Sequence, residues 1–237
     1  AIDALNQALD RLLVEAVQSN APFLQAVLDE PDFRKGDIHT GYIAQHFPDG
    51  FHGTAPRAEQ WLQICAAAVY IHAVRVRRGA LIEGRLSPPR DLDGPMRWVV
   101  IAGAYSAPVE ITLDEDDGEA EIWAPTLSDK RLMLVRDWVP GRHLFEAVFK
   151  TKGRDPVELA VQFSDRTEGY RLRSRGFAET VLVCTPRMAE LHARLPAREA
   201  ADAAGQITSP MPGLVISVDA EAGAEVKAGQ ALLVVEA

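Results

Sequence analysis

The residues that could do chemistry as a unit gather near the C-terminus, where proline, glycine and short apolar runs alternate. Residues 209–213 read Ser-Pro-Met-Pro-Gly, and apolar strand patterns follow at 214–218 and 231–235. Gly223, in the stretch 221–223, and Gly229, in the stretch 226–230, allow tight reversals because glycine accepts positive φ without a Cβ clash. This pattern is typical of a small carrier domain that presents one lysine on a hairpin. The alternative interpretation is an ordinary pair of hairpins.

Lys227 is the lysine of this segment, but its position argues against attachment of a cofactor. It lies in the turn before the last strand pattern, where we expect a solvated surface lysine. About thirty residues of such a domain bury too little apolar surface to fold alone. We therefore expect the rest of the domain beyond Ala237. An apolar period that starts at once at Leu5 likewise indicates a longer polypeptide upstream.

Other candidate groups lack the arrangements that catalysis or metal binding requires. His39, His46 and His52 lie among turn residues without metal-ligand spacing, so we expect no zinc site. Residues 114–117 (Asp-Glu-Asp-Asp) lack the alternating ligands of a calcium loop and indicate a solvated hairpin turn. His72 falls on an apolar helix pattern and is expected to be a core histidine with its hydrogen bonds satisfied. The sequence therefore predicts no catalytic and no metal-binding residue in this chain.

Composition narrows the class of protein further. The net charge of the 237 residues is -9, and scattered rather than clustered basic residues argue against nucleic-acid binding, which depends on Lys and Arg set against phosphates. The most apolar run, 64–76, is interrupted by His72 and Arg75, so no membrane span is expected. Cys65 and Cys184 form no CxxC pair and no disulfide framework, which fits a reducing, intracellular setting.

The middle of the chain predicts an α+β fold, an antiparallel β-barrel of about eight strands around a long central helix. The helix is expected at 55–78, with Thr54 able to cap it and Gly79 after its end. Apolar residues on most of its sides indicate that it is enclosed. Strand patterns then fill 97–184, and closure into a barrel would remove the exposed edges of an open sheet. The expected strands are 97–102, 109–113, 119–124, 131–135, 144–149, 157–163, 170–175 and 180–183.

Three flanking segments complete the organisation. Residues 1–53 predict short helices that lack a core of their own and close over a larger domain. Residues 84–95 contain three prolines and neither helical nor strand period, so they form a loop that is either functional or disordered. Residues 196–205 are rich in alanine without an apolar stripe, which is typical of a linker.

Several of these stretches resemble biotin-dependent carboxylases. Residues 209–215 (Ser-Pro-Met-Pro-Gly-Leu-Val), 226–230 (Val-Lys-Ala-Gly-Gln) and 234–237 (Val-Val-Glu-Ala) resemble the biotin carboxyl carrier domain. Lipoyl domains share this architecture, but biotinyl domains continue Met-Lys-Met after Glu-Ala. Residues 18–24 and 36–43 are similar to the end of a biotin carboxylase domain.

The middle of the chain resembles the domain that joins the alpha to the beta subunit in the alpha-subunit family of propionyl-CoA carboxylase. The similar stretches are 137–141, 169–172, 174–176 and 185–191. This resemblance implies that the barrel part, 54–195, is a subunit-docking domain. It also implies that 1–53 ends a biotin carboxylase domain and that 206–237 is the first half of a biotinyl or lipoyl-type barrel-sandwich. In that family the loop between helix and barrel is a hook that grips the beta subunit. Residues 84–95 occupy that place, which implies partner binding by Arg85, Leu86, Pro88, Pro89, Arg90, Leu92 and Pro95.

The resemblance also implies an activity for the complete protein, a ligase that forms carbon–carbon bonds. Biotin, covalently held on a lysine outside the chain, is carboxylated with ATP and bicarbonate at an upstream site that uses Mg or Mn. A carboxyltransferase beta subunit then transfers the carboxyl group to propionyl-CoA. The implied assembly is a heterododecamer of six alpha and six beta subunits, with biotin protein ligase as a further partner. The protein is expected in the bacterial cytoplasm, or in the mitochondrial matrix of a eukaryote.

Two alternatives stay open. The first is an alpha subunit for another acyl-CoA, such as methylcrotonyl-, acetyl- or longer-chain acyl-CoA, because acyl choice resides in the beta subunit. The second is a non-enzymatic carrier or interaction module with a lipoyl-like domain.

Overall fold

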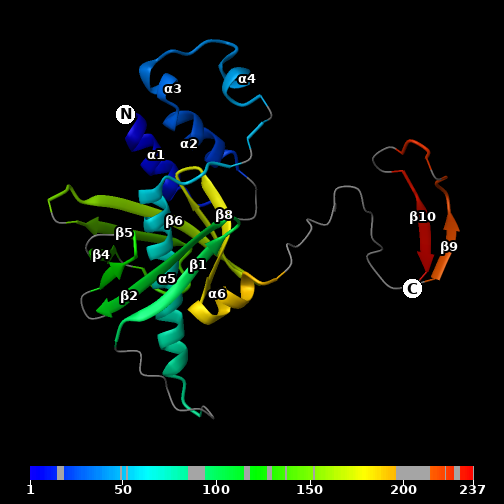
Figure 1. Ribbon diagram of the computed structural model, residues 1–237. Coiled ribbons are helices and arrows are strands. Elements are labelled where there is room, and N and C mark those ends of the chain that lie inside the picture. Colours follow the sequence, from blue (N-terminus) through cyan, green and yellow to red (C-terminus); the bar gives the residue numbers. More distant parts are fainter. Residues whose placement is uncertain are drawn as a thin grey trace. The chain divides into compact units, whose positions relative to one another are not determined.

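The chain forms two compact units, Ala1–Ala193 and Arg194–Ala237, each described by itself (Figure 1). Residues 1–53 and the barrel lie in the same compact unit, because the first helices pack on the barrel. The predicted domain boundary after residue 53 stays a prediction. The computed structural model describes residues 1–14, 19–48, 50–51, 53–84, 94–114, 118–126, 130–136, 138–151, 153–195, 214–221, 223–226 and 230–236. The predicted linker 196–205 lies outside these residues.

The first unit is built on a closed antiparallel barrel of eight strands in sequence order, as the strand patterns predict. Closure comes from β1 and β8, which pair with Val99 opposite Cys184. Every strand therefore has two neighbours, and the barrel has no free edge. The strands are β1 Met96–Ala102, β2 Tyr105–Asp114, β3 Glu119–Trp123, β4 Arg131–Arg136, β5 Leu144–Lys150, β6 Val157–Arg166, β7 Gly169–Ser174 and β8 Phe177–Cys184.

Three strands exceed their predicted bounds by three residues or more at one end. β2 begins at Tyr105 rather than at 109, and Pro108 lies inside it opposite Val99. Proline lacks an N–H donor, which is why the pattern around it is not typical of a strand. β6 continues to Arg166, and β8 begins at Phe177, next to the turn that joins it to β7. In all three, the added residues pair with a neighbouring strand although they lack strand periodicity.

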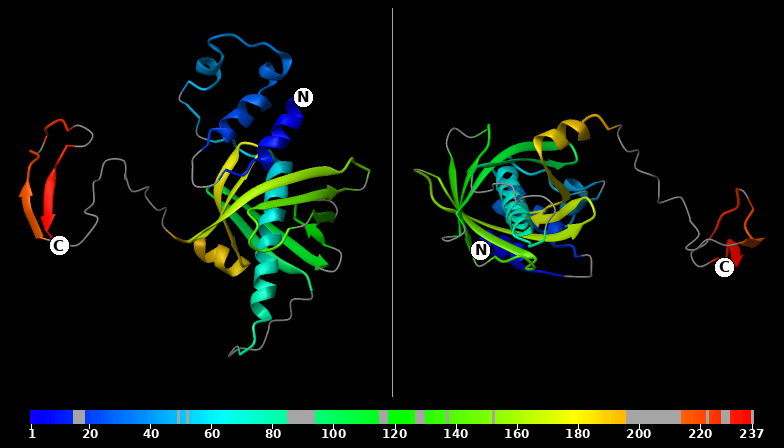
Figure 2. Two further views of the ribbon diagram at one scale, coloured as in Figure 1. Left: turned by 180° about the vertical axis from the view of Figure 1, so that it is seen from behind. Right: turned by 90° about the horizontal axis from the view of Figure 1, so that it is seen from below.

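The central helix α5, Ala58–Ala80, runs through the barrel, as the view along its axis shows (Figure 2). Its inward turns carry Ile64, Val69, Ile71 and the alanines 66–68, all fully buried. The core fills the space between these residues and the inward side chains of the strands, such as Phe145 and Phe177. Small alanines allow a helix to fit inside eight strands at close packing density.

The predicted bounds of this helix, 55–78, are off at both ends. The N-cap residue is Arg57, and the predicted cap, Thr54, instead donates its backbone N–H to the carbonyl of Gly176 at 3.4 Å. At the other end Gly79 lies inside the helix, because its φ is not in the left-handed region that ends helices at glycine. The helix therefore continues to Ala80, one residue before the exposed Leu81.

Four short helices precede the barrel and cover one of its ends (Figure 1). They are α1 Ile2–Arg11, α2 Ala21–Asp29, α3 Pro31–Lys35 and α4 Tyr42–His46. Helix α1 packs against β6 and α2. Aromatic rings connect the later part of this segment to α2, with the centroids of Phe23 and Phe47 5.2 Å apart. Their buried apolar residues are Ala21, Val27, Leu28 and Tyr42, and α1 joins the group to the barrel.

A short helix after the barrel, α6 Pro186–His192, packs against β1. Its N-cap is Thr185, whose hydroxyl accepts the N–H of Met188 at 3.3 Å.

The second unit contains the antiparallel pair β9 Leu214–Val218 and β10 Leu233–Glu236. The side chains of Leu214, Ile216 and Val218 are more than half exposed in it. No helix in the described part of the chain is long and apolar enough to span a bilayer.

Candidate functional site

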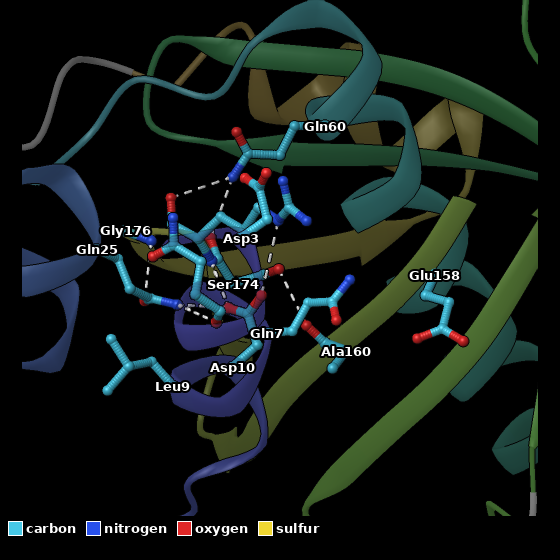
Figure 3. Close-up of polar contacts among 12 residues, drawn as sticks. Asp3, Gln7, Leu9, Asp10, Gln25, Gln60, Glu158, Ala160, Ser174 and Gly176 are labelled. Carbon is cyan, nitrogen blue, oxygen red and sulfur yellow. Dashed lines mark hydrogen bonds and ion pairs between the residues drawn. The ribbon is translucent and has the colours of Figure 1, made fainter. Parts of the chain in front are cut away.

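The turn between β7 and β8 is the centre of a polar network that joins distant parts of the chain (Figure 3). Ser174 pairs with Phe177, which leaves a two-residue loop, Arg175 and Gly176, with φ of 46° and 79°. Two positive φ values are typical of the turns that match the twist of antiparallel strands. At Gly176 a Cβ would lie 2.9 Å from Thr54 Oγ1 and 3.3 Å from the carbonyl of Pro22, so only glycine fits.

Both N–H groups of this loop donate to side chains of the N-terminal helices. Asp10 Oδ1 accepts the backbone N–H of Arg175 at 2.7 Å, and Gln25 Oε1 accepts that of Gly176 at 3.1 Å. Gln25 Nε2 in turn donates to Asp10 Oδ1 at 2.7 Å, which connects α1 to α2. We call the side chains of Asp10 and Gln25 together with residues 175–176 the turn anchor.

Gln162 on β6 fixes the end of α1. Its Nε2 donates to the carbonyls of Asp10 and Leu12, each at 2.8 Å. The last carbonyls of a helix have no partner within it, so a buried amide donor satisfies them without water. Helix α1 is therefore bound both to the turn and to the barrel wall.

The first turn of α5 binds the same loop from the other side. Gln60 Nε2 donates to the carbonyl of Ser174 at 3.1 Å. The Ser174 hydroxyl donates to the carbonyl of Ala160 at 3.0 Å, which ties the loop to β6. With the bond from Thr54 to Gly176, the backbone of this one turn is held by the N-terminal helices, by the central helix and by the segment between them.

Asp10 is buried, with only 5% of the residue exposed. Burial raises its pKa, and the hydrogen bonds from Arg175 N–H and Gln25 oppose this rise. The Arg175 side chain adds a weaker attraction, with Nε 3.7 Å from Asp10 Oδ2. A hollow of about 230 Å³ lies beside the network and is lined in part by Gln60, Gln63 and Glu158.

A second polar cluster lies where α5 approaches the far end of the barrel. His72 Nδ1 lies 3.0 Å from the hydroxyl of Tyr170, so His72 has the hydrogen-bond partner that was predicted, although the residue is half-buried rather than fully enclosed. Burial, and then the charge of Arg75, lowers its pKa. The Arg75 guanidinium lies over the Tyr170 ring, 5.2 Å from its centroid, and pairs with Asp165 at the end of β6. This cluster holds the last turns of α5 against the barrel wall.

The loop predicted to bind a partner begins beyond this cluster. Arg85, Leu86, Pro88, Pro89, Arg90 and Leu92 lie outside the described residues, and Pro95 is exposed. The residues that lead into the loop, Leu81 and Ile82, are apolar and 76% and 65% exposed. The partner-binding role of residues 84–95 stays a prediction.

Comparison with known proteins identifies the barrel. The family model of the propionyl-coenzyme A carboxylase BT domain matches residues 64–198, which include most of α5, all eight strands and α6. The chain belongs to the propionyl-CoA carboxylase BT domain family. The BT domain of this chain is thus the barrel with its enclosed helix.

Several known proteins match this chain over its whole length. The propionyl-CoA carboxylase alpha chain of Ruegeria pomeroyi is 36% identical over 238 residues and covers 100% of this chain. The mitochondrial propionyl-CoA carboxylase alpha chains of Mus musculus and Homo sapiens are 24% and 23% identical, again over 100% of it. The match takes in 33%, 32% and 32% of these relatives, so the chain spans about a third of their length.

The turn anchor joins two parts of the chain. Its side chains, Asp10 and Gln25, precede the matched residues 64–198, whereas its turn, residues 175–176, lies within them. Sequence patterns did not single out these side chains, because their partners are backbone groups about 150 residues or more away. Within the described part of the chain no three His, Cys, Asp or Glu side chains gather as a metal site. The carrier-like stretch 209–213, Lys227 and most of the acidic stretch 114–117 lie outside the described residues.

Proposed function

We propose that this chain is the docking region of the alpha subunit of a biotin-dependent acyl-CoA carboxylase of the propionyl-CoA type. The observation that carries the proposal is the closed barrel around α5, which coincides with the match to the BT domain over residues 64–198. The alpha chains that match all of this chain are named as propionyl-CoA carboxylase subunits, which supports the same activity for the complete protein.

In this proposal the barrel holds a carboxyltransferase beta subunit through residues 84–95. Two exposed apolar residues, Leu81 and Ile82, lead into this loop and would be covered by a partner. Prolines in the loop lower the entropy that is lost when it becomes ordered on binding. Helix α5 is enclosed along most of its length, so it presents the loop from a rigid base.

The chemistry belongs to other parts of the complete protein. ATP and Mg or Mn would act at a biotin carboxylase site upstream, and biotin protein ligase would attach biotin to a lysine beyond Ala237. Residues 196–205 would give the carrier reach, which raises its effective concentration at both active sites. We further propose a heterododecamer of six alpha and six beta subunits, in the cytoplasm or the mitochondrial matrix.

The function is tested on the full-length protein co-expressed with a beta subunit from the same genome. A streptavidin blot should detect the alpha subunit, and the purified complex should fix labelled bicarbonate into propionyl-CoA in the presence of ATP. A panel of acetyl-, propionyl-, methylcrotonyl- and longer acyl-CoA substrates assigns the acceptor. An alpha subunit without biotin, or a complex that fixes no bicarbonate with any acyl-CoA, would refute the carboxylase function.

The docking role needs its own test. Replacement of residues 85–92 by a Gly-Ser segment of equal length should abolish co-purification of the beta subunit. The matched control is a Gly-Ser replacement of residues 125–130, which precede Arg131, the β4 residue that pairs with Glu59 at the start of α5. Retained association in the first variant would reject the hook.

A further inference from the structure

The turn anchor has the properties of a positioning device. Two consecutive N–H groups of the turn point to Asp10 and Gln25, which come from two different helices. We propose that the turn anchor fixes the orientation of the biotin carboxylase part of the subunit on the barrel, and that Asp10 and Gln25 are positioning residues for delivery of carboxybiotin. This inference rests on the proposed function, in which residues 1–53 end that carboxylase domain.

Directional bonds set orientation better than apolar contact does. Asp10 and Gln25 are 5% and 4% exposed, and each binds a backbone group whose own direction is fixed by the hairpin. Gln162 holds the end of α1 against β6 in addition. A rotation of α1 and α2 on the barrel would break the bonds to Arg175 and Gly176 together, because both acceptors are joined through Gln25 Nε2.

The anchored turn is also bound to the element that leads to the proposed docking loop. Gln60 in the first turn of α5 donates to Ser174, and Glu59 next to it pairs with the largely buried Arg131 of β4. Helix α5 then continues without a break for 23 residues, about 34 Å at 1.5 Å per residue. Arg75 fixes its last turns to Asp165. One rigid path therefore connects the N-terminal helices to the exit of α5.

A fixed orientation matters because a tethered carrier must reach two active sites. Its effective concentration at each site depends on the distance that the linker has to span. If the carboxylase part turned freely on the barrel, the carrier would be well placed for a smaller fraction of the time. The coupled reaction would become slower, whereas each half-reaction with free substrates would not change.

The test uses the full-length alpha subunit in complex with its beta subunit. The variants are Asp10→Ala, Gln25→Ala and the milder Asp10→Asn, which keeps an acceptor for Arg175 N–H. The control is Arg187→Ala, which removes an exposed ion pair with Glu190 on α6. Spin labels at Lys35→Cys and Lys130→Cys, whose side chains are 70% and 54% exposed, report the orientation by electron paramagnetic resonance distances. Cys65 and Cys184 of this chain are buried, and accessible cysteines in the rest of the complex are replaced by serine before labelling.

We expect one narrow distance distribution in the wild type and the control, and a broader or shifted one in the alanine variants. The coupled rate in those variants should fall by about threefold or more, with biotin carboxylation of free biotin and beta-subunit association unchanged. Asp10→Asn should lie between them and the wild type. The positioning role is overturned by a distribution that stays narrow, by an unchanged coupled rate, or by a half-reaction that falls in parallel. If the wild type fixes no bicarbonate, the proposed function fails, and the distance measurement still decides whether the anchor sets the orientation.

Discussion

Asp10 Oδ1 lies 2.7 Å from the backbone nitrogen of Arg175, which is 165 residues further along the chain. This bond joins the first helix to a hairpin turn whose residue 175 has a φ of 46°, a conformation that costs a non-glycine residue about 1–2 kcal/mol. The carboxylate stabilises that turn by accepting an N–H that points away from the hairpin.

Asp10→Ala should lower the free energy of unfolding by about 1–3 kcal/mol, since Arg175 N–H and Gln25 Nε2 both lose their acceptor in a part-buried place. Urea unfolding followed by circular dichroism measures the change. Asp32→Ala, in which an exposed pair with Lys35 is lost, is the matched control and should stay within about 0.5 kcal/mol. Equal losses in both variants would show that the bond to the turn does not stabilise the fold.

The same carboxyl group should give a distinctive pH dependence. Burial raises the pKa of Asp10, so the native state binds this proton more tightly than the unfolded state does. Its contribution to stability therefore falls as the pH rises from the ordinary range of aspartate, about pH 4, through the raised pKa. The free energy of unfolding of the wild type minus that of Asp10→Asn should therefore be larger at about pH 4 than at pH 7.

Asp165→Asn should show the opposite sign and serves as the comparison. The hydrogen bond from Arg75 holds the pKa of Asp165 below its usual range. The advantage of the wild type over Asp165→Asn should therefore be present at pH 7 and be lost on acidification. Urea titrations of both variants at several pH values measure these differences, and the same sign in both would contradict the assigned environments.

Gly176→Ala should destabilise the barrel more than Gly103→Ala does. Both glycines have positive φ, 79° and 54°, so both substitutions carry the backbone strain of about 1–2 kcal/mol. At Gly103 nothing lies within 4 Å of the new Cβ, whereas at Gly176 it meets Thr54 and Pro22. A lower thermal midpoint for Gly176→Ala measures the additional clash, and equal midpoints would mean that Thr54 moves aside without cost.

Ala67→Leu should destabilise the first unit by about 1–3 kcal/mol or more, because a closed barrel cannot widen to admit three further carbons. Ala67 lies on α5 inside the barrel and is fully buried. Ala58→Leu is the control, since Ala58 is exposed at the start of the same helix. Similar unfolding midpoints of the two variants would imply that the barrel contains unfilled space next to α5.

Leu81→Ser together with Ile82→Ser should weaken association with the beta subunit without loss of stability. Both side chains are exposed, so their removal costs the isolated subunit little, but a partner that covers them would lose apolar contact of about 25 cal/mol per Å². Co-purification and thermal unfolding measure the two effects. Met188→Ser, with a side chain 54% exposed on α6, is the control. Unchanged association would place the beta subunit elsewhere.

The sequence by itself determined the local elements of this protein and its family. Apolar residues on most sides of α5 and the period-two runs after it predict a helix inside strands. Both patterns can be seen in the sequence because they reflect which faces of each element are buried. Helix ends were less predictable. Thr54 has the chemistry of a cap, yet its N–H binds Gly176, a partner that no local pattern shows.

Only the tertiary structure decided how the N-terminal helices are joined to the barrel. Asp10, Gln25 and Gln162 are ordinary polar residues in sequence. The backbone partners of Asp10 and Gln25 lie in the β7–β8 turn, and those of Gln162 lie at the end of α1. Every residue has a backbone carbonyl and every residue except proline a backbone N–H, so these partners leave no compositional trace. The physical reason is that hydrogen bonds depend on distance and direction, and for residues this far apart in sequence both exist only after folding.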